Sequence, residues 1–395
     1  MLKDQFQYIS IREVMEQLDV SRSTVDRWRK TKQMPSVKIG KEIYFDKNEL
    51  QRWYRGLSRM RRVPEDAPPV LAITVGYTPV STHMWSPIVI KELGLFEQEL
   101  GRIRPSDRID VRWHRAKDGM ELVKGMLAGQ IQIATFGDYA LSVCRLLSQI
   151  MPDFHPVLLA AGGKSPRGGG FAFVVPNGTV LNDLSELATL PIATTFRTNA
   201  EYRLRKLLES HRLPELNIIH RSIDDSIESL RQGRLNATMM WEPYLSLVRH
   251  EGIGIAVFQR ELASGLLAGV AADERWVLAH EDVTVAYMKA HLLAGRLFRE
   301  EPYRAAPAIA KETEWPVEAV IRSISNVRWD AALYRNDLKL LNHVDPAFYL
   351  GYNASPSDIR VPYSVKYLRI AAQELKLPVP PPAPLEGEWH GAICY

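Results

Sequence analysis

Residues 10–53 read SIREVMEQLDVSRSTVDRWRKTKQMPSVKIGKEIYFDKNELQRW, and this stretch decides the fold of the first part of the chain. Ser10 and Glu13 have the spacing of a capping box, in which each side chain satisfies a free backbone N–H group of the first helical turn. Apolar residues then recur on one helical face, which predicts a short amphipathic helix. Because Ser21 can cap a second helix after a tight turn, the pattern predicts a helix-turn-helix.

The rest of the same stretch predicts a hairpin and a third helix. PSVKI and EIYFD both alternate apolar and polar residues, and Gly40 and Lys41 stand between them at the position of a hairpin turn. This hairpin would form a wing beside the helices. Asp46 has the spacing to cap the third helix, which can close a small core over Trp28. The pattern therefore predicts a complete folding unit over residues 1–56.

Over residues 8–55 this stretch resembles the winged helix-turn-helix domains of the excisionase and MerR type. The resemblance implies that the second helix enters the major groove of double-stranded DNA and that the wing touches the backbone or the minor groove. The residues it assigns to DNA contact are Arg22, Ser23, Arg27, Lys30, Lys38 and Lys41. The wing departs from many members by holding Glu42-Ile43-Tyr44 where a further arginine is common. A second interpretation is a small protein-interaction domain whose basic residues only face solvent.

Charge is unevenly distributed along the 395 residues. The whole chain has a net charge of +4, yet residues 1–63 hold 15 Lys and Arg against 8 Asp and Glu. The basic end is therefore the candidate nucleic-acid surface. Because a single unit neutralises few phosphates, we expect a homodimer on a palindromic site.

Composition limits the other classes of protein. Hydrophobic residues make up 46% and charged residues 24% of the chain, which is typical of soluble globular proteins, and no apolar run approaches a membrane span of about 18 residues. The first residues lack the order of an export signal. The two cysteines, Cys144 and Cys394, are too few for a metal cluster or a disulfide framework. We therefore expect a cytoplasmic protein without cofactor or metal.

After residue 70, strands and helices alternate in two series, which predicts a two-lobed α/β domain. A glycine-rich break over residues 162–170 separates the series, and a mainly helical region later returns to the first lobe. The predicted divisions are a DNA-binding unit at 1–56, a linker at 57–69, a first lobe at about 70–163 and 266–376, a second lobe at about 168–262, and a proline-rich tail at 377–395. Its proline run favours an extended arm over packed structure.

Over about residues 70–345 the chain is similar to the periplasmic solute-binding proteins of the sulfonate, nitrate, taurine and thiamine-pyrimidine-precursor type. The pieces that carry this similarity are VGYTP (75–79), ELGLF (92–96), AGQIQIA (128–134), FGD (136–138), VVP (174–176) and WEP (241–243). The similarity implies a hinged type II clamp that binds a small molecule between its lobes. The missing export signal and the DNA-binding unit in front depart from that family.

Ligands of open α/β sheets lie beyond the carboxyl ends of the strands, which points to the loops there. The candidate ligand-binding residues are Tyr77, Thr78, His83, Trp85, Thr135, Phe136, Gly137, Asp138, Thr195, Arg197, Thr198, Asn199, Trp241 and Glu242. A helix start near Thr198 and the charge of Arg197 favour an anion. Asp138 and Glu242 favour ligand donors instead, so a molecule of both polarities or a pyrimidine-like ring is consistent with the set. Thr198 and Asn199 could equally serve only as helix caps.

One chain with a DNA-binding unit and a ligand clamp predicts a ligand-sensing transcription regulator. Two alternatives stay open: a transport-type solute-binding protein, or an enzyme like the pyrimidine synthases and desulfinases of this fold. The enzyme is disfavoured because no phosphate loop, metal-spaced His and Cys cluster or Ser-His-Asp pattern stands out.

Overall fold

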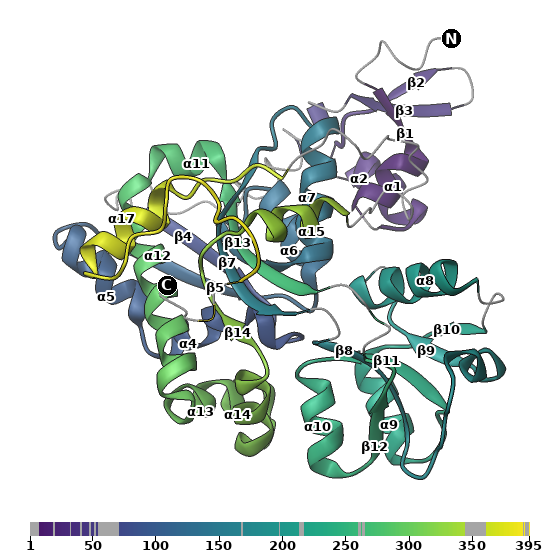
Figure 1. The fold of residues 1–395 in the computed structure, drawn as a ribbon. Coiled ribbons are helices and arrows are strands. Elements are labelled where there is room, and N and C mark those ends of the chain that lie inside the picture. Colours follow the sequence, from purple (N-terminus) through teal and green to yellow (C-terminus); the bar gives the residue numbers. More distant parts are fainter. Residues whose placement is uncertain are drawn as a thin grey trace.

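The computed structural model shows a helix-turn-helix unit and a domain of two lobes (Figure 1). The residues it describes are 8–18, 20–31, 33–39, 42–46, 49–50, 53, 71–166, 169–196, 198–212, 217–259, 262, 265–343, 361–389, 391 and 395. The linker predicted at residues 57–69 lies outside these ranges.

In the described residues, the first unit is a three-stranded antiparallel sheet with the helices α1 (Ile11–Leu18) and α2 (Arg22–Thr31) against it. Its strands lie in the order β1 (Tyr8–Ser10), β3 (Glu42–Asp46), β2 (Val37–Ile39). The predicted hairpin is confirmed as β2 and β3. The strand β1 adds to the sheet and is too short to stand out as a period-two pattern.

Local hydrogen bonds fix this unit as its sequence predicts. The backbone N–H of Ser10 donates to Glu13 Oε2 at 2.6 Å, and the backbone N–H of Glu13 donates to Ser10 Oγ at 3.3 Å, so the capping box is confirmed. The rings of Trp28 and Trp53 lie 5.9 Å apart between centroids, which confirms the predicted closure of the core. Phe45 of β3 is fully buried in the same core.

A six-stranded sheet forms the first lobe. Its order is β14 (Arg328–Trp329), β7 (Pro156–Ser165), β13 (Leu266–Asp273), β6 (Ile133–Gly137), β4 (Leu71–Tyr77), β5 (Ile109–Arg115). The pairs of β4 with β5 and β6 are parallel, whereas β13 is antiparallel to both β6 and β7. The sheet is mixed because β13 is the strand that returns from the second lobe.

Helices cover both faces of this sheet. One face carries α4 (Ser86–Glu92), α5 (Leu95–Ile103), α12 (Glu281–Glu300), α13 (Pro302–Thr313), α14 (Val317–Ser325) and α17 (Lys366–Glu374). The other carries α6 (Gly119–Leu127), α7 (Asp138–Ile150) and α15 (Arg335–His343). The lobe also holds α11 (Glu274–Ala279) and a 3-10 turn, η1 (Thr82–Met84).

The second lobe is a five-stranded sheet with its own apolar core. Its order is β10 (Ile218–His220), β9 (Ile192–Thr194), β11 (Ala237–Trp241), β8 (Phe171–Pro176), β12 (Gly254–Val257). Its helices are η2 (Leu184–Thr189), α8 (Asn199–His211), α9 (Ile223–Arg231) and α10 (Tyr244–Glu251). The chain enters this lobe after β7 and leaves it before β13, so two crossings join the lobes (Figure 1).

Two glycines of β7 set the place of η1. A Cβ atom at Gly162 would lie 3.0 Å from the carbonyl oxygen of His83, and one at Gly163 would lie 2.7 Å from the Cα of His83. A side chain at either position would therefore push this turn away from the sheet. The sequence GG brings the backbone of His83 down onto β7.

The proline-rich tail packs on its own first lobe rather than standing free as an arm. It is extended, and Leu385 forms a parallel bridge with Tyr334. Trp389 Nε1 donates to Asp337 Oδ1 at 2.9 Å, and the buried Lys164 of β7 donates from Nζ to Asp337 Oδ2 at 2.6 Å. The tail thus covers a buried ion pair. The proline run by itself does not predict this packing.

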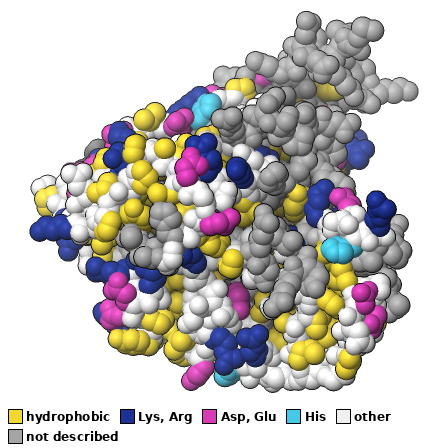
Figure 2. All heavy atoms as spheres, in the orientation of Figure 1, with side chains coloured by type: hydrophobic (Ala, Val, Ile, Leu, Met, Phe, Trp, Pro, Cys, Tyr) yellow, Lys and Arg dark blue, Asp and Glu magenta, His cyan; other side chains and the backbone are white. Residues whose placement is uncertain are grey.

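The two lobes carry charges of both signs on the face shown in Figure 2, where Lys and Arg side chains alternate with Asp and Glu. Within the described ranges, no helix is long and apolar enough to span a lipid bilayer.

Candidate functional site

The exposed face of α2 carries most of the residues predicted to contact DNA. Arg22, Ser23, Arg27 and Lys30 are exposed on this helix, whereas Val25 is fully buried beneath it. Lys38 is exposed on β2, and Lys41 lies outside the described residues.

The cations of this face differ in how strongly they are held. Arg22 Nε lies 3.9 Å from Asp26 Oδ2, and Arg29 Nη1 lies 3.2 Å from Asp26 Oδ1. Within the described ranges, Arg27, Lys30 and Lys38 have no carboxylate partner. Unpaired, exposed cations are the groups that contact phosphates. Their role in DNA contact stays a prediction.

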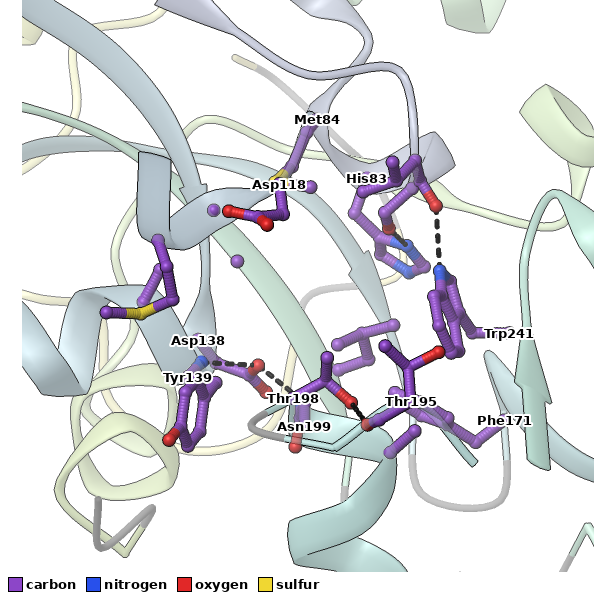
Figure 3. Close-up of a pocket in the computed structure, with 18 of the residues that line it drawn as sticks. His83, Met84, Asp118, Asp138, Tyr139, Phe171, Thr195, Thr198, Asn199 and Trp241 are labelled. Carbon is purple, nitrogen blue, oxygen red and sulfur yellow. Dashed lines mark hydrogen bonds between the residues drawn. The ribbon is translucent and has the colours of Figure 1, made fainter. Parts of the chain in front are cut away.

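A second candidate site is a cleft of about 200 Å³ between the two lobes (Figure 3). Seven of the predicted ligand contacts line it: His83, Gly137, Asp138, Thr195, Thr198, Asn199 and Trp241. The other lining residues are Val80, Ser81, Met84, Asp118, Gly119, Met120, Tyr139, Ala140, Phe171, Phe196, Ala200, Leu266 and Leu267. The two sets come from both lobes and from both crossings.

Six of the predicted ligand contacts lie away from this cleft. Thr78, Trp85, Thr135 and Phe136 are fully buried. The hydroxyl of Tyr77 donates to a carboxylate of α13, with Tyr77 Oη 3.0 Å from Glu312 Oε1. Glu242 is bonded to α14, as described below. Arg197 lies outside the described residues.

The imidazole of His83 is held between two serine hydroxyls. Its Nε2 lies 2.8 Å from Ser165 Oγ, and its Nδ1 lies 3.2 Å from Ser81 Oγ. Burial, together with the smaller effect of the positive charge of Arg203, lowers the pKa of His83 to about 3. The ring is therefore neutral at physiological pH, and its two nitrogens act as one donor and one acceptor.

Asp138 joins the two lobes at the start of α7. Its Oδ1 accepts from the backbone N–H of Tyr139 at 2.8 Å and from Nδ2 of Asn199, and its Oδ2 accepts from Arg203 Nη2 at 3.1 Å. The side chains of Asp138 and Arg203 are only 1% and 4% exposed. Burial raises the pKa of Asp138, and the charge of Arg203 opposes this rise. Because Asn199 and Arg203 belong to α8, this buried cluster holds the second lobe against the first.

A second group of contacts between the lobes surrounds Trp241 and Glu242. Trp241 Nε1 donates to the carbonyl of Val80 at 2.8 Å. The Glu242 carboxylate accepts from Ser323 Oγ of α14 at 3.2 Å and from Nδ2 of Asn326, the residue that follows this helix, at 2.8 Å. Glu242 thus fastens the lobes together instead of lining the cleft. The structure therefore has its two lobes in contact on both sides of the cleft.

The residues that sequence reasoning missed fall into two groups. Asp118 follows β5 and caps α6, so the rule of strand carboxyl ends that selected Asp138 also applied to it. Phe171 and Leu266 lie where the chain crosses between lobes, and Arg203 lies a full helical turn after Asn199. No local pattern marks these last three, because the fold of the lobes brings Phe171 and Leu266 to the cleft and Arg203 to Asp138 beside it.

Comparison with known proteins assigns the two parts of the chain separately. Residues 8–58 match the family model described as a helix-turn-helix domain. No curated protein matches the chain. Among solved structures, the alkanesulfonate-binding protein SsuA from Xanthomonas axonopodis pv. citri bound to MOPS has a TM-score of 0.58 at 16% identity, and the match covers 74% of this chain and 97% of that one.

Two further solved structures agree. The periplasmic aliphatic sulphonate binding protein SsuA from Escherichia coli has a TM-score of 0.58 at 15% identity, covering 72% of this chain and 93% of that one. The periplasmic nitrate-binding protein NrtA from Synechocystis PCC 6803 has a TM-score of 0.57 at 16% identity, covering 79% and 91%. The chain therefore joins a helix-turn-helix domain to a domain with the periplasmic-binding-protein fold, as both resemblances predicted.

Proposed function

We propose that this protein is a cytoplasmic, ligand-sensing transcription regulator. The observation that carries the proposal is a helix-turn-helix with unpaired, exposed cations in the same chain as a two-lobed domain with a cleft between the lobes. A small polar molecule binds in the cleft and changes the affinity of the helix-turn-helix for double-stranded DNA.

DNA recognition falls to α2 and the hairpin. In this proposal α2 lies in the major groove, where Arg27 reaches base edges while Lys30 contacts phosphate. Lys38 of the hairpin adds a second phosphate contact. Two copies of the chain bind one palindromic site as a homodimer, because one copy supplies few phosphate contacts.

Coupling between the sites arises from the contacts that join the lobes. Lining residues such as His83 and Asn199 belong to different lobes, so a molecule in the cleft binds the closed form more tightly than the open form. This difference in affinity sets the largest possible effect on DNA binding, typically about 1–3 kcal/mol. A ligand thereby changes how the paired DNA-binding units are presented.

The experiment is a fluorescence anisotropy titration of the full chain against a labelled duplex from the region upstream of its own gene. Arg27→Ala should weaken binding by about tenfold or more, the expected cost of a lost base contact. Arg112→Ala, an exposed arginine on β5, is the matched control and should leave binding unchanged. Equal affinity of wild type and Arg27→Ala would contradict the proposal.

A second candidate is a transport-type solute-binding protein, which the named structural neighbours favour. That candidate predicts export and no affinity for DNA, so the same titration separates the two. An enzyme of the desulfinase type needs a reactive cysteine in the cleft. Cys144 instead lies in α7 outside the cleft, and burial raises the pKa of its thiol to about 12, so we favour a non-enzyme.

A further inference from the structure

The described lining of the cleft carries carboxylates and no cationic side chain. Asp118 and Asp138 both line it, and no lysine or arginine stands among its described lining residues. The one histidine, His83, is neutral because burial lowers its pKa. A negatively charged ligand would therefore meet the negative charge of Asp118, whereas the charge of Asp138 is balanced by Arg203.

The chain's own carboxylate already fills the place where an anion would bind. Among the described residues of this region, the start of α8 and the guanidinium of Arg203 are the groups that would attract a negative charge. Both face Asp138, which accepts from Asn199 and Arg203. Arg203 also donates to the carbonyl of Gly265 and lies over the Phe171 ring, with its Cζ 4.8 Å from the ring centroid. An anionic ligand would have to displace Asp138 from this buried cluster.

Asp118 leaves acceptor capacity open in the cleft. Its Oδ1 accepts from the backbone N–H of Glu121 at 2.8 Å and so caps α6. Its Oδ2 has no partner among the described residues. Figure 3 shows this carboxylate across the cleft from Trp241, beside Met84. The free oxygen is suited to an N–H donor, and best to a charged one.

The opposite wall suits a flat apolar body. The rings of Phe171 and Trp241 lie 6.0 Å apart between centroids at an angle of 51°, and the bond from Trp241 Nε1 to the Val80 carbonyl holds the indole in place. The thioethers of Met84 and Met120 complete an adaptable apolar lining. Such a wall binds a ring by stacking and tolerates a nearby cation on it.

We infer that this cleft takes a small aromatic amine, with its ring against Trp241 and Phe171 and its nitrogen donating to Asp118, and that it excludes sulfonates and carboxylates. This inference deepens the proposed function and depends on it only for the use of the cleft as the sensing site. Its volume of about 200 Å³ restricts the ligand to about one substituted ring.

The test is isothermal titration calorimetry of the full chain with three probes that share one ring: benzylamine, benzyl alcohol and phenylmethanesulfonate. Benzylamine should bind about tenfold or more tightly than phenylmethanesulfonate, with benzyl alcohol between them. Equal or tighter binding of the sulfonate would overturn the inference. So would the absence of benzylamine binding at about 10 mM, which is weaker than a charge-assisted contact allows.

A variant pair checks the role of Asp118. Asp118→Asn keeps a good helix cap while removing the charge, and should weaken benzylamine binding by about tenfold. Asp183→Asn is the matched control, because Asp183 caps η2 away from the cleft and its variant should bind benzylamine as wild type does. If Asp118→Asn lowers the unfolding temperature, Asp118→Ser supplies a second uncharged cap. Unchanged benzylamine affinity in the folded variant would refute the assignment.

Anisotropy titrations of the labelled duplex, repeated in the presence of each probe, separate this inference from the proposed function. Benzylamine that binds without changing DNA affinity would refute the regulator while leaving the ligand class standing. A sulfonate that binds and changes DNA affinity would do the reverse.

Discussion

The two candidate binding surfaces of this protein handle positive charge in opposite ways. On α2, Arg27 and Lys30 are exposed and lack a carboxylate partner among the described residues. Beside the cleft, Arg203 is buried and bonded to Asp138, so its charge helps to hold the two lobes together. Counting basic residues therefore does not locate an anion site. What matters is whether the cation still has a free face.

The largest expected effect comes from breaking the cleft pair. Arg203→Ala should lower the free energy of unfolding of the two-lobed domain by about 3–5 kcal/mol, because Asp138 would stay buried without its cation. Urea unfolding followed by circular dichroism measures this. The matched control on the same helix is Lys206→Ala, which removes a pair with both side chains 55% exposed and should cost less than about 1 kcal/mol. Similar losses in the two variants would show that the buried pair contributes no more to stability than the exposed pair.

The next effect depends on pH and sharpens the neutral character of the cleft. The unfolded chain binds a proton at His83 below pH 6.5, whereas the folded pKa of about 3 keeps the ring neutral. His83 therefore does not lower the free energy of unfolding above pH 6.5. Below that pH it lowers this free energy increasingly, by about 2 kcal/mol at pH 5. His83→Gln should narrow the stability gap between pH 7.5 and pH 5 by about this amount.

Exposed His250 provides the control for that experiment. His250→Gln should leave the gap between the two pH values as it is in wild type. If His83→Gln left the difference in stability between pH 7.5 and pH 5 unchanged, His83 would have to be protonated in the folded protein at pH 5. Buried His291, whose pKa burial also lowers, accounts for part of the gap that remains.

A smaller effect tests the contact between Trp241 and Val80. Trp241→Phe keeps the aromatic wall but removes the indole donor, and should cost about 1 kcal/mol of stability because a partly buried carbonyl loses its partner. Trp113→Phe removes a comparable donor, 3.0 Å from Glu97 Oε1 on the surface, and should cost less. Urea unfolding compares the two. A larger loss of stability in Trp113→Phe would show that the contact between Trp241 and Val80 is not the more important of the two.

The smallest expected effect belongs to the DNA surface. Lys30→Ala and Lys38→Ala should each lower the slope of log affinity against log salt by about 0.9, the contribution of one phosphate contact, with little change in sequence preference. Anisotropy titrations at several salt concentrations measure this slope. Lys206→Ala, on the second lobe, should leave the slope unaltered. If neither Lys30→Ala nor Lys38→Ala changed the slope, DNA would have to bind at another surface.

Much of the fold follows from local sequence patterns. The capping box at Ser10 and Glu13 and the hairpin of β2 and β3 are determined by residues close together in the chain, so spacing alone predicts them. The mixed sheet of the first lobe is different. Its strand β13 pairs with β6 and β7, but the residues of the second lobe lie between them in the sequence. A local pattern of apolar residues therefore does not predict this pairing.

The cleft was predictable in position but only partly in its residues. The rule of strand carboxyl ends selects the right edge of the sheet, and it found His83, Asp138 and Trp241. It does not say which side chain at a strand end turns into the cleft, so Phe136 falls in the core. Arg203 was missed because its partner Asp138 lies in the other lobe.

The tail has a practical consequence for work with recombinant protein. Trp389 donates to Asp337, which in turn holds Lys164, the residue next to the serine that positions His83. Truncation before Trp389 would leave Asp337 with one donor fewer. Protein prepared for binding assays should therefore retain Trp389.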